Sequence, residues 1–177
     1  MPNLPSQPAN RRVGSLLQGL IPRSRFPRTC RLWPIPVFFA QLLPFLAVAR
    51  HRLIDGDEGF YLMASRLVFE HKVPYRDFFF TQMPLTPYLY GLWMQIAGRS
   101  WMSARFFSAV LAALLGTVLF AHVCHETRRP TAGLLAVVMF TSSTLVFAWF
   151  TVVKTFAPAG LFLILGNSGI CCCCGVA

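Results

Sequence analysis

The feature that most constrains this chain is a series of long apolar runs that contain almost no charge. The run 102–123 holds a single charged residue, Arg105, and is as long as the ~20 residues that a helix needs to cross a bilayer. Similar runs cover 32–49, 131–150 and 152–166. Only 12% of the whole chain is charged, about half the fraction usual in soluble domains. We therefore predict an all-α, polytopic transmembrane protein with three to four spans, with Arg105 snorkelling at the end of its span.

The charge is placed unevenly along the chain. Residues 1–31 are rich in proline and arginine and offer little to bury, which predicts a disordered basic tail. Positive flanks hold that side of a span in the cytoplasm. A net charge of +10 can also indicate nucleic-acid binding. No groove-reading motif or basic-aromatic alternation accompanies it, so we expect no nucleic-acid partner.

The first apolar run is interpreted as an uncleaved signal anchor. The alternative, a cleaved signal peptide, calls for small residues at the cleavage site, whereas Arg50, His51 and Arg52 follow the run. The short loop 126–130 carries two arginines, which marks it as cytoplasmic as well. The unit 32–166 is thus expected to be an integral, multi-pass membrane domain whose loop 50–101 is periplasmic or otherwise extracytoplasmic.

The loop 50–101 is predicted to contain two juxtamembrane, interfacial helices. The first covers Glu58 to His71, with Phe60 and Met63 on its apolar face and Ser65 on the opposite face. The second covers Pro84 to Gly98 and is rich in Tyr and Trp, which favour the membrane interface.

Acidic residues gather at the start of this loop. Asp55, Asp57 and Glu58 lie so close in sequence that they favour a nearby cation or proton. Two functional interpretations are a divalent cation such as Mg or Mn on Asp57 and Glu58, and a general base acting on an acceptor hydroxyl. The plain alternative is a solvated loop whose acids cap the following helix.

Three further charged residues are candidates for the same site. Arg76 and Asp77 either belong to it or form a local salt bridge in a turn. Lys154 opens the fourth apolar run on the same outer side. It can meet a phosphate as a point charge or simply snorkel at a helix end.

The last residues, 167–177, differ in composition from the rest of the chain and include the run Cys171 to Cys174. Three interpretations are open: lipid acylation of the cysteines, metal binding, and a sequence altered by a frameshift or premature stop. The abrupt change after Gly166 favours the third.

A set of short motifs follows in order between Asp55 and Gly166. They are Asp57-Glu58-Gly59-Phe60-Tyr61, Val73-Pro74-Tyr75-Arg76-Asp77, Pro84-Leu85, Gly98-Arg99-Ser100, Ala104-Arg105-Phe106 and Lys154-Thr155-Phe156-Ala157. In order and spacing this stretch resembles the N-terminal part of GT-C glycosyltransferases of the dolichyl-phosphate-mannose mannosyltransferase-like group. That group includes bacterial lipid A and lipopolysaccharide sugar transferases. Met83 departs from the pattern, because many relatives have lysine there.

The resemblance implies a sugar donor linked to a polyprenyl phosphate and a lipid, glycan or protein acceptor outside the cytoplasm. Asp57 would be the catalytic carboxylate, and Glu58 would support it or share a metal. The substrate-binding positions would be Asp55, Tyr61, Arg76, Asp77 and Lys154.

Two further expectations accompany this resemblance. Relatives have many more spans, so we expect little transfer from this chain alone. The alternative function is a small membrane-anchored interaction protein with an acylated cysteine tail. A transporter fragment is disfavoured because the spans contain almost no charge.

Overall fold

The computed structural model describes residues 32–167, and all of the regular structure in that range is helical. The helices are α2 (Pro34–His51), α3 (Gly56–Phe69), α4 (Leu85–Ala97), α5 (Trp101–Thr127), α6 (Pro130–Ser142), α7 (Thr144–Trp149) and α8 (Phe156–Asn167). The all-α prediction is therefore confirmed for this part of the chain. The predictions for 1–31 and for the run Cys171 to Cys174 concern residues outside the described range.

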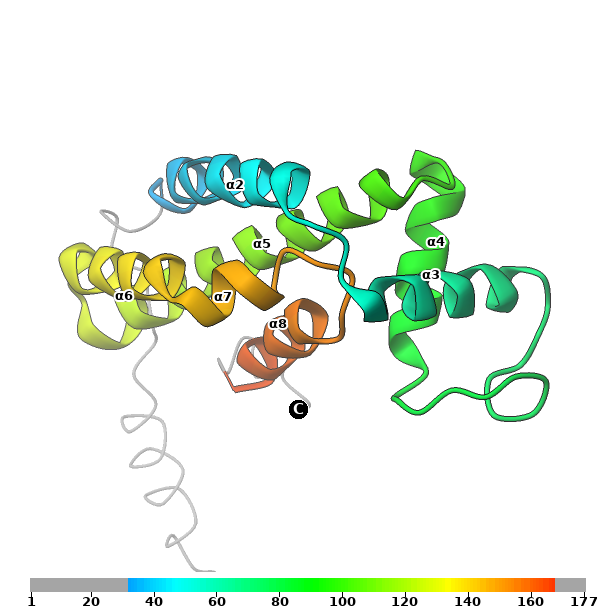
Figure 1. Ribbon diagram of the computed structural model, residues 1–177. Coiled ribbons are helices and arrows are strands. Elements are labelled where there is room, and N and C mark those ends of the chain that lie inside the picture. The colour runs from blue at the N-terminus through cyan, green and yellow to red at the C-terminus, as the bar shows by residue number, and fades with distance from the viewer. Residues whose placement is uncertain (1–31, 168–177) are drawn as a thin grey trace, which may run out of the picture.

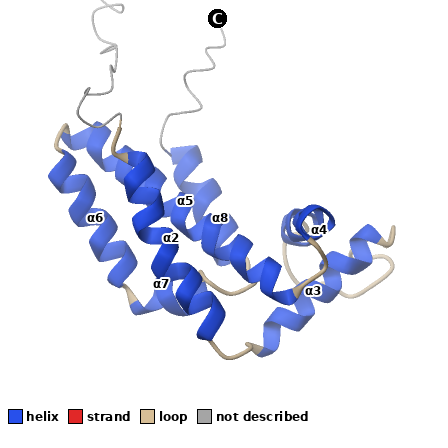
Figure 2. Ribbon diagram, turned by 90° about the horizontal axis from the view of Figure 1, so that it is seen from above, coloured by secondary structure: helices blue, strands red, loops and turns tan. Residues whose placement is uncertain are grey.

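Helix α5 is the centre of the structure, with α2, α6 and α8 packed around it (Figures 1 and 2). Helix α2 runs antiparallel to α5, because Ala49 near its end lies beside Arg105, whereas Val37 near its start lies beside Phe120. Within residues 32–167, two helices, α2 and α5, are long and apolar enough to cross a membrane. Helices α6 and α8 are apolar but shorter.

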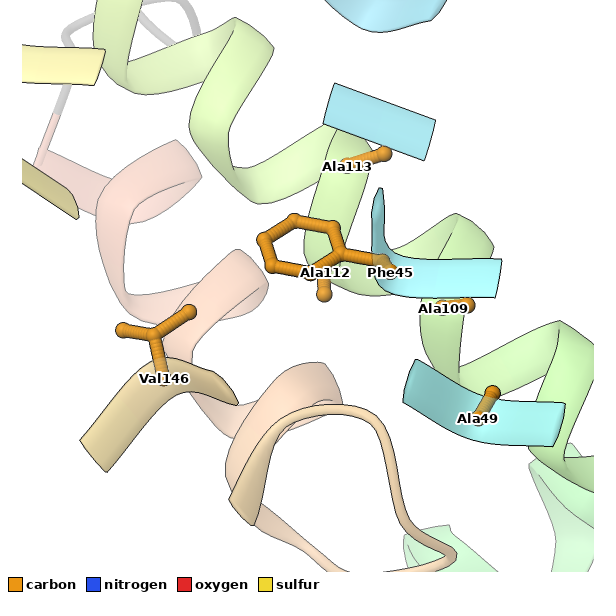
Figure 3. Close-up of a cluster of buried hydrophobic side chains, with 6 residues drawn as sticks. All are labelled: Phe45, Ala49, Ala109, Ala112, Ala113 and Val146. Atoms are coloured by element: carbon orange, nitrogen blue, oxygen red, sulfur yellow. The ribbon is translucent and has the colours of Figure 1, made fainter. Parts of the chain in front are cut away.

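Small side chains allow α2 to approach α5 closely. Phe45 of α2 lies over Ala109 and Ala112 of α5 and reaches toward Val146 of α7 (Figure 3). Phe45 is completely buried. Small residues at a crossing let two backbones come together, which is the usual way in which membrane helices gain packing contacts.

A buried amide of α2 links this helix to α6. Gln41 is only 3% exposed, donates to the carbonyl of Val37 and accepts from Thr141 of α6. A Cβ added to Gly116 would lie 1.9 Å from the Gln41 Oε1 atom. The glycine therefore makes the space that this polar contact between helices requires.

The run 131–150, predicted as one continuous span, is divided into two helices. Ser143 adopts an extended conformation with ψ of 122° between α6 and α7. The break falls in the polar run Thr141 to Thr144, and the Ser142 hydroxyl donates to the carbonyl of Met139. Hydroxyl side chains of this kind compete with the helical hydrogen bonds of the backbone, which hydropathy alone does not register.

The run predicted to start at 152 likewise begins its helix only at Phe156. Residues 150–155 form a bent, non-helical segment in which Thr151, Val152 and Val153 are buried. We call residues 150–155 the 150–155 segment. It lies against the start of α3 and positions the site described below.

The two helices predicted for loop 50–101 correspond to α3 and α4. They pack on each other at the end of the bundle where α2 ends and α5 begins (Figure 2). On α3 the side chain of Met63, from the predicted apolar face, is 55% exposed, whereas Ser65, from the opposite face, is fully buried. The cause is the close approach of α4, where Gly91 lies against the Ser65 carbonyl.

Candidate functional site

The first turn of α3 is built by the acidic residues singled out in the sequence. Asp55 is the N-cap, and its Oδ1 atom accepts the backbone N–H of Asp57 at 3.1 Å. The Glu58 carboxylate accepts the backbone N–H of Asp55 at 3.4 Å. These reciprocal bonds form a capping box, which satisfies two backbone donors that the first turn leaves free. The helix-capping interpretation of the acidic cluster is confirmed.

Lys154 closes the other side of this turn. Its Nζ atom lies 3.2 Å from Asp55 Oδ1 and 3.0 Å from Asp57 Oδ2, and 4.1 Å from the centre of the Trp149 ring. The Lys154 side chain is 8% exposed and that of Asp57 is 67% exposed. The nearly buried ammonium group of Lys154 thus contacts the solvent-exposed carboxylate of Asp57.

These contacts move the pKa values of the participating groups. The hydrogen bond from the Asp57 N–H, followed by the contact with Lys154, lowers the pKa of Asp55 despite partial burial. Burial alone would lower the pKa of Lys154, but hydrogen bonds and charges from Asp57 and Asp55 outweigh it and raise that pKa. Burial, followed by the charge of Asp57, raises the pKa of Tyr61. The lowered pKa of Asp55 and the raised pKa of Lys154 keep this carboxylate and this ammonium charged near neutral pH. We call Asp55, Asp57 and Lys154 the carboxylate–ammonium cluster.

The expectation that Arg105 snorkels was wrong, because Arg105 is completely buried. Its Nη2 atom lies 2.7 Å from Glu58 Oε2, and its Nε atom lies 2.9 Å from Glu58 Oε1. The guanidinium also donates to the carbonyls of Ala49, Arg52 and Leu53 at the end of α2. These acceptors offset the free-energy cost of removing the guanidinium charge from water.

Glu58 is as buried as Arg105, and donors other than the arginine complete its shell. The Trp101 indole donates to Oε2 at 3.1 Å, and the backbone N–H of Val153 donates to Oε1 at 3.1 Å. No buried side-chain polar atom in residues 32–167 lacks a partner. Glu58 therefore ties α3 to α5 and to the 150–155 segment, and it does not face the solvent beside Asp57.

The residues present do not fit the divalent cation considered on Asp57 and Glu58. Asp57 is neutralised by Lys154, and Glu58 by Arg105. Across residues 32–167 no group of three or more His, Cys, Asp or Glu side chains is placed to hold a metal. Asp57 and Glu58 therefore do not form a divalent-cation site.

A cavity lies next to the carboxylate–ammonium cluster. Its volume is about 730 Å³, and its walls come from loop 75–83, the start of α4, the end of the 150–155 segment and α8, among them Tyr75, Gln82, Met83, Thr155, Pro158 and Phe162. The buried Tyr61 lies between the cluster and this cavity, because its hydroxyl interacts with Gln82 and Thr155 and feels the charges of Asp57 and Lys154. The volume is within the range of small-ligand sites.

A second, smaller pocket lies on another side of Lys154. It measures about 280 Å³ and is lined by Leu145, Trp149, Phe150, Phe156 and Lys154 itself. Apart from the ammonium group, its walls are apolar. The lysine thus contributes to this pocket while it binds the two aspartates.

Arg76 and Asp77 do not join this cluster. They form an exposed pair with each other, with 2.9 Å between Arg76 Nε and Asp77 Oδ1. The Arg76 hydrogen bond, followed by that from the Val73 N–H, lowers the pKa of Asp77. The structure thus supports the local salt bridge for these two residues.

Two features of the site were not predicted from the sequence. Trp149 lies under Lys154, and Trp101 lies 4.2 Å from the Arg105 guanidinium carbon as well as donating to Glu58. For Arg105, the sequence showed a cation inside an apolar run and within the motif Ala104-Arg105-Phe106. Such a residue requires a buried acceptor, and Glu58 was a candidate for it.

No protein-family model, characterised protein or solved structure matches this chain.

Proposed function

We propose that this chain is a glycosyltransferase unit of the GT-C kind, which transfers a sugar from a polyprenyl-phosphate-linked donor to an acceptor outside the cytoplasm. The observation that carries the proposal is the exposed Asp57 carboxylate, which lies 3.0 Å from Lys154 Nζ. A mostly apolar cavity, whose wall includes Thr155, the residue after Lys154, lies on the other side of Tyr61. This arrangement combines a base, a cation and an apolar site at one end of a helical bundle.

The proposal includes a membrane topology in which α2, α5, the α6–α7 pair and α8 are the three to four spans. It is supported by the length and apolar character of α2 and α5 and by the exposed apolar residues Leu135 and Val138 of α6 and Leu163 of α8. Asp57 and Lys154 lie at the end where α2 ends and α5 begins. With the N-terminus in the cytoplasm, that end is extracytoplasmic.

In the proposed reaction Asp57 is the general base. The acceptor hydroxyl attacks the sugar carbon that carries the phosphate, the bond from that carbon to the phosphate oxygen breaks, and Asp57 takes the hydroxyl proton. The polyprenyl phosphate leaves with the electron pair of the broken bond. Lys154 Nζ lies 3.0 Å from Asp57 Oδ2, and the Asp57 side chain is still 67% exposed, so an acceptor hydroxyl can reach the carboxylate. A positioned base of this kind contributes roughly 10²–10⁴-fold to a rate.

Lys154 is proposed to bind the donor phosphate by exchanging one aspartate for it. Ion pairs with an exposed partner are worth little, so such an exchange costs little free energy. The cavity beside Tyr61, or the pocket beside Trp149, would receive the apolar part of the lipid. The exposed Phe60 and Met63 of α3 suit a helix lying at the membrane surface.

The test is a transfer assay with the chain in proteoliposomes that contain a radiolabelled polyprenyl-phosphate sugar. Because little transfer is expected from this chain alone, label is collected over long incubations, and a wild-type chain without transfer would overturn the proposed function. Asp57→Asn should reduce transfer by about 10²–10⁴-fold. The matched control is Glu70→Gln, which removes one negative charge from the exposed Arg66–Glu70 pair at the other end of α3. Transfer that survives Asp57→Asn would overturn the assignment of the base.

A second readout does not depend on turnover. A donor analogue with a photoreactive group on its first isoprene unit should crosslink to the cavity wall, at Met83 or Phe162. Excess unlabelled donor should prevent the crosslink. Crosslinking that is spread over the exposed faces of α2 and α6 instead would contradict the proposed binding site.

A further inference from the structure

The buried and exposed ion pairs occupy neighbouring positions on the same two segments. Asp57 and Glu58 are consecutive on α3, and Val153 and Lys154 are consecutive on the 150–155 segment. Glu58 Oε1 accepts the Val153 N–H at 3.1 Å, and Asp57 Oδ2 meets Lys154 Nζ at 3.0 Å. One contact is hidden from solvent and the other is open to it.

We propose that Glu58 and Arg105 are positioning residues, which fix where Lys154 meets Asp57 by tying the 150–155 segment to the first turn of α3. The catalytic meaning of this role rests on the proposed function, but the geometric claim does not. Neither residue faces the cavity, and both side chains are 0% exposed. They act through Asp57 and Lys154 and not on the substrate.

The 150–155 segment needs such an anchor because it lacks the hydrogen bonds of a helix. The Lys154 N–H bonds the Val152 carbonyl within the segment. The buried N–H of Val153, the residue directly before Lys154, requires an acceptor, and Glu58 supplies it. The buried side chains of Val152 and Val153 keep the segment in the core. Apolar packing is non-directional, however, so it does not set the rotation that directs Lys154 toward the aspartates.

Arg105 determines where the Glu58 carboxylate itself lies. The guanidinium binds the carboxylate through two nitrogens and, on its other side, three carbonyls at the end of α2. A planar fork of donors has one geometry in which all of these bonds form. The Arg105 guanidinium of α5 thus fixes the relative positions of three segments: the end of α2, the start of α3 and the 150–155 segment.

The sequence offers a direct measurement, because Lys72 and Lys154 are its two lysines. Only an unprotonated amine reacts with an acylating reagent, so the pH profile of labelling reports the pKa of each lysine, whatever its accessibility. Lys72 is exposed and serves as the internal reference. In the full chain in lipid nanodiscs, Lys154 should react with an inflection above the usual amine value of 10.5, because Asp57 and Asp55 raise its pKa.

Glu58→Gln should move the Lys154 inflection to lower pH, with about a tenfold gain in labelling at fixed pH for each unit of pKa. The inflection of Lys72 should not move. Glu70→Gln is the matched control, since it makes the same change in an exposed pair on the same helix, and it should leave Lys154 unchanged. Asp57→Asn is the positive control, because it removes a direct partner of Lys154.

An unchanged Lys154 inflection in a folded Glu58→Gln variant, with Asp57→Asn shifting it, would overturn the inference and leave the proposed function standing. Unchanged inflections in both variants would overturn it as well. If circular dichroism shows that Glu58→Gln is unfolded, Trp101→Phe is used in its place, because it removes only the indole donor to Glu58. The same shift of the Lys154 inflection is then expected, and an unchanged inflection would overturn the inference. A shifted Lys154 together with sugar transfer that survives Asp57→Asn would support the positioning role and refute the proposed function.

Discussion

Two cation–carboxylate clusters lie one residue apart on α3, and they differ in almost everything except their charges. In one, Glu58 and Arg105 are both 0% exposed, and two nitrogens of the Arg105 guanidinium donate to the Glu58 carboxylate. In the other, Lys154 is 8% exposed, Asp55 19% and Asp57 67%. Consecutive residues of one capping turn thus contribute to an enclosed pair and to an open one.

The difference in solvent exposure determines what each cluster can do. Breaking a buried ion pair leaves a charge without water or a partner, so such a pair does not readily change partners. Opening a pair with a solvated partner costs little, because water replaces the lost contact. The buried pair can therefore hold geometry, whereas the open pair can exchange partners with a substrate, as the proposed reaction requires.

The largest expected effect is the loss of the buried pair. Arg105→Met leaves the Glu58 carboxylate buried without its cation and should lower the free energy of unfolding by about 3–5 kcal/mol. Denaturant titration in bicelles measures this. The double variant Glu58→Leu/Arg105→Met should recover part of the loss, since no charge is then stranded. A double variant less stable than Arg105→Met would contradict this view of the pair.

The second prediction concerns the open cluster and sharpens the contrast. Asp57→Asn should leave the free energy of unfolding within about 1 kcal/mol of the wild type, as expected for a pair with an exposed partner. The same variant should lose sugar transfer by about 10²–10⁴-fold. Thermal unfolding and the proteoliposome assay, run on one preparation, check the two halves. A strongly destabilised Asp57→Asn variant would show that the clusters are not different in kind.

The third prediction is a smaller loss at Trp149. Trp149→Leu removes the ring that lies 4.1 Å from the Lys154 ammonium, and a partly buried cation–π contact is worth roughly 0.5–2 kcal/mol. Stability should fall by that amount, and Lys154 should label faster than in the wild type at the same pH. Labelling at the wild-type rate would mean that the aspartates alone hold the lysine.

The fourth prediction is a pH window for the open cluster. The pKa of Asp55 is lowered, so its contribution is present above the usual carboxyl value of 3.8 and is lost as pH falls below it. The pKa of Lys154 is raised, so its contribution is present below the usual amine value of 10.5 and is lost as pH rises above it. The amide chemical shift of Asp57, which donates to Asp55, should be constant between these limits. A transition near neutral pH would contradict the assignment.

The smallest effect should come from the exposed Arg66–Glu70 pair, whose side chains are 60% and 42% exposed. Glu70→Gln should change the free energy of unfolding by about 0.3–0.5 kcal/mol, and high salt should abolish the difference. The measurement is the same denaturant titration at two ionic strengths. A salt-independent loss of several kcal/mol would remove this variant as a control.

Some of the site could be predicted from the sequence because it depends on neighbours along the chain. Asp55 and Glu58 are three residues apart, as a capping box requires, and the helix begins there. The pairing of Arg76 with Asp77 is local in the same way. The apolar runs also predicted most helices, although the hydroxyl side chains at 141–144 divided one of them.

The roles of the individual charges depended on contacts that are distant in sequence. Arg105 and Glu58 are 47 positions apart, and Glu58 and Val153 are 95 apart. From the sequence, Glu58 and Asp57 were equivalent acids, and Arg105 and Lys154 were both snorkelling candidates. Hydropathy and spacing describe how a residue suits its own helix, but they do not state which groups surround it.

The order of apolar and acidic residues along the chain was enough to predict the helices and the gathering of acids at one helix start. Which of these acids is buried with an arginine, and which faces solvent beside a lysine, depended on how the helices pack. The cause is that the free energy of a charge depends on the groups that replace its lost water. For Glu58 and Arg105 those groups come from α2, α5 and the 150–155 segment, which meet only when the helices pack.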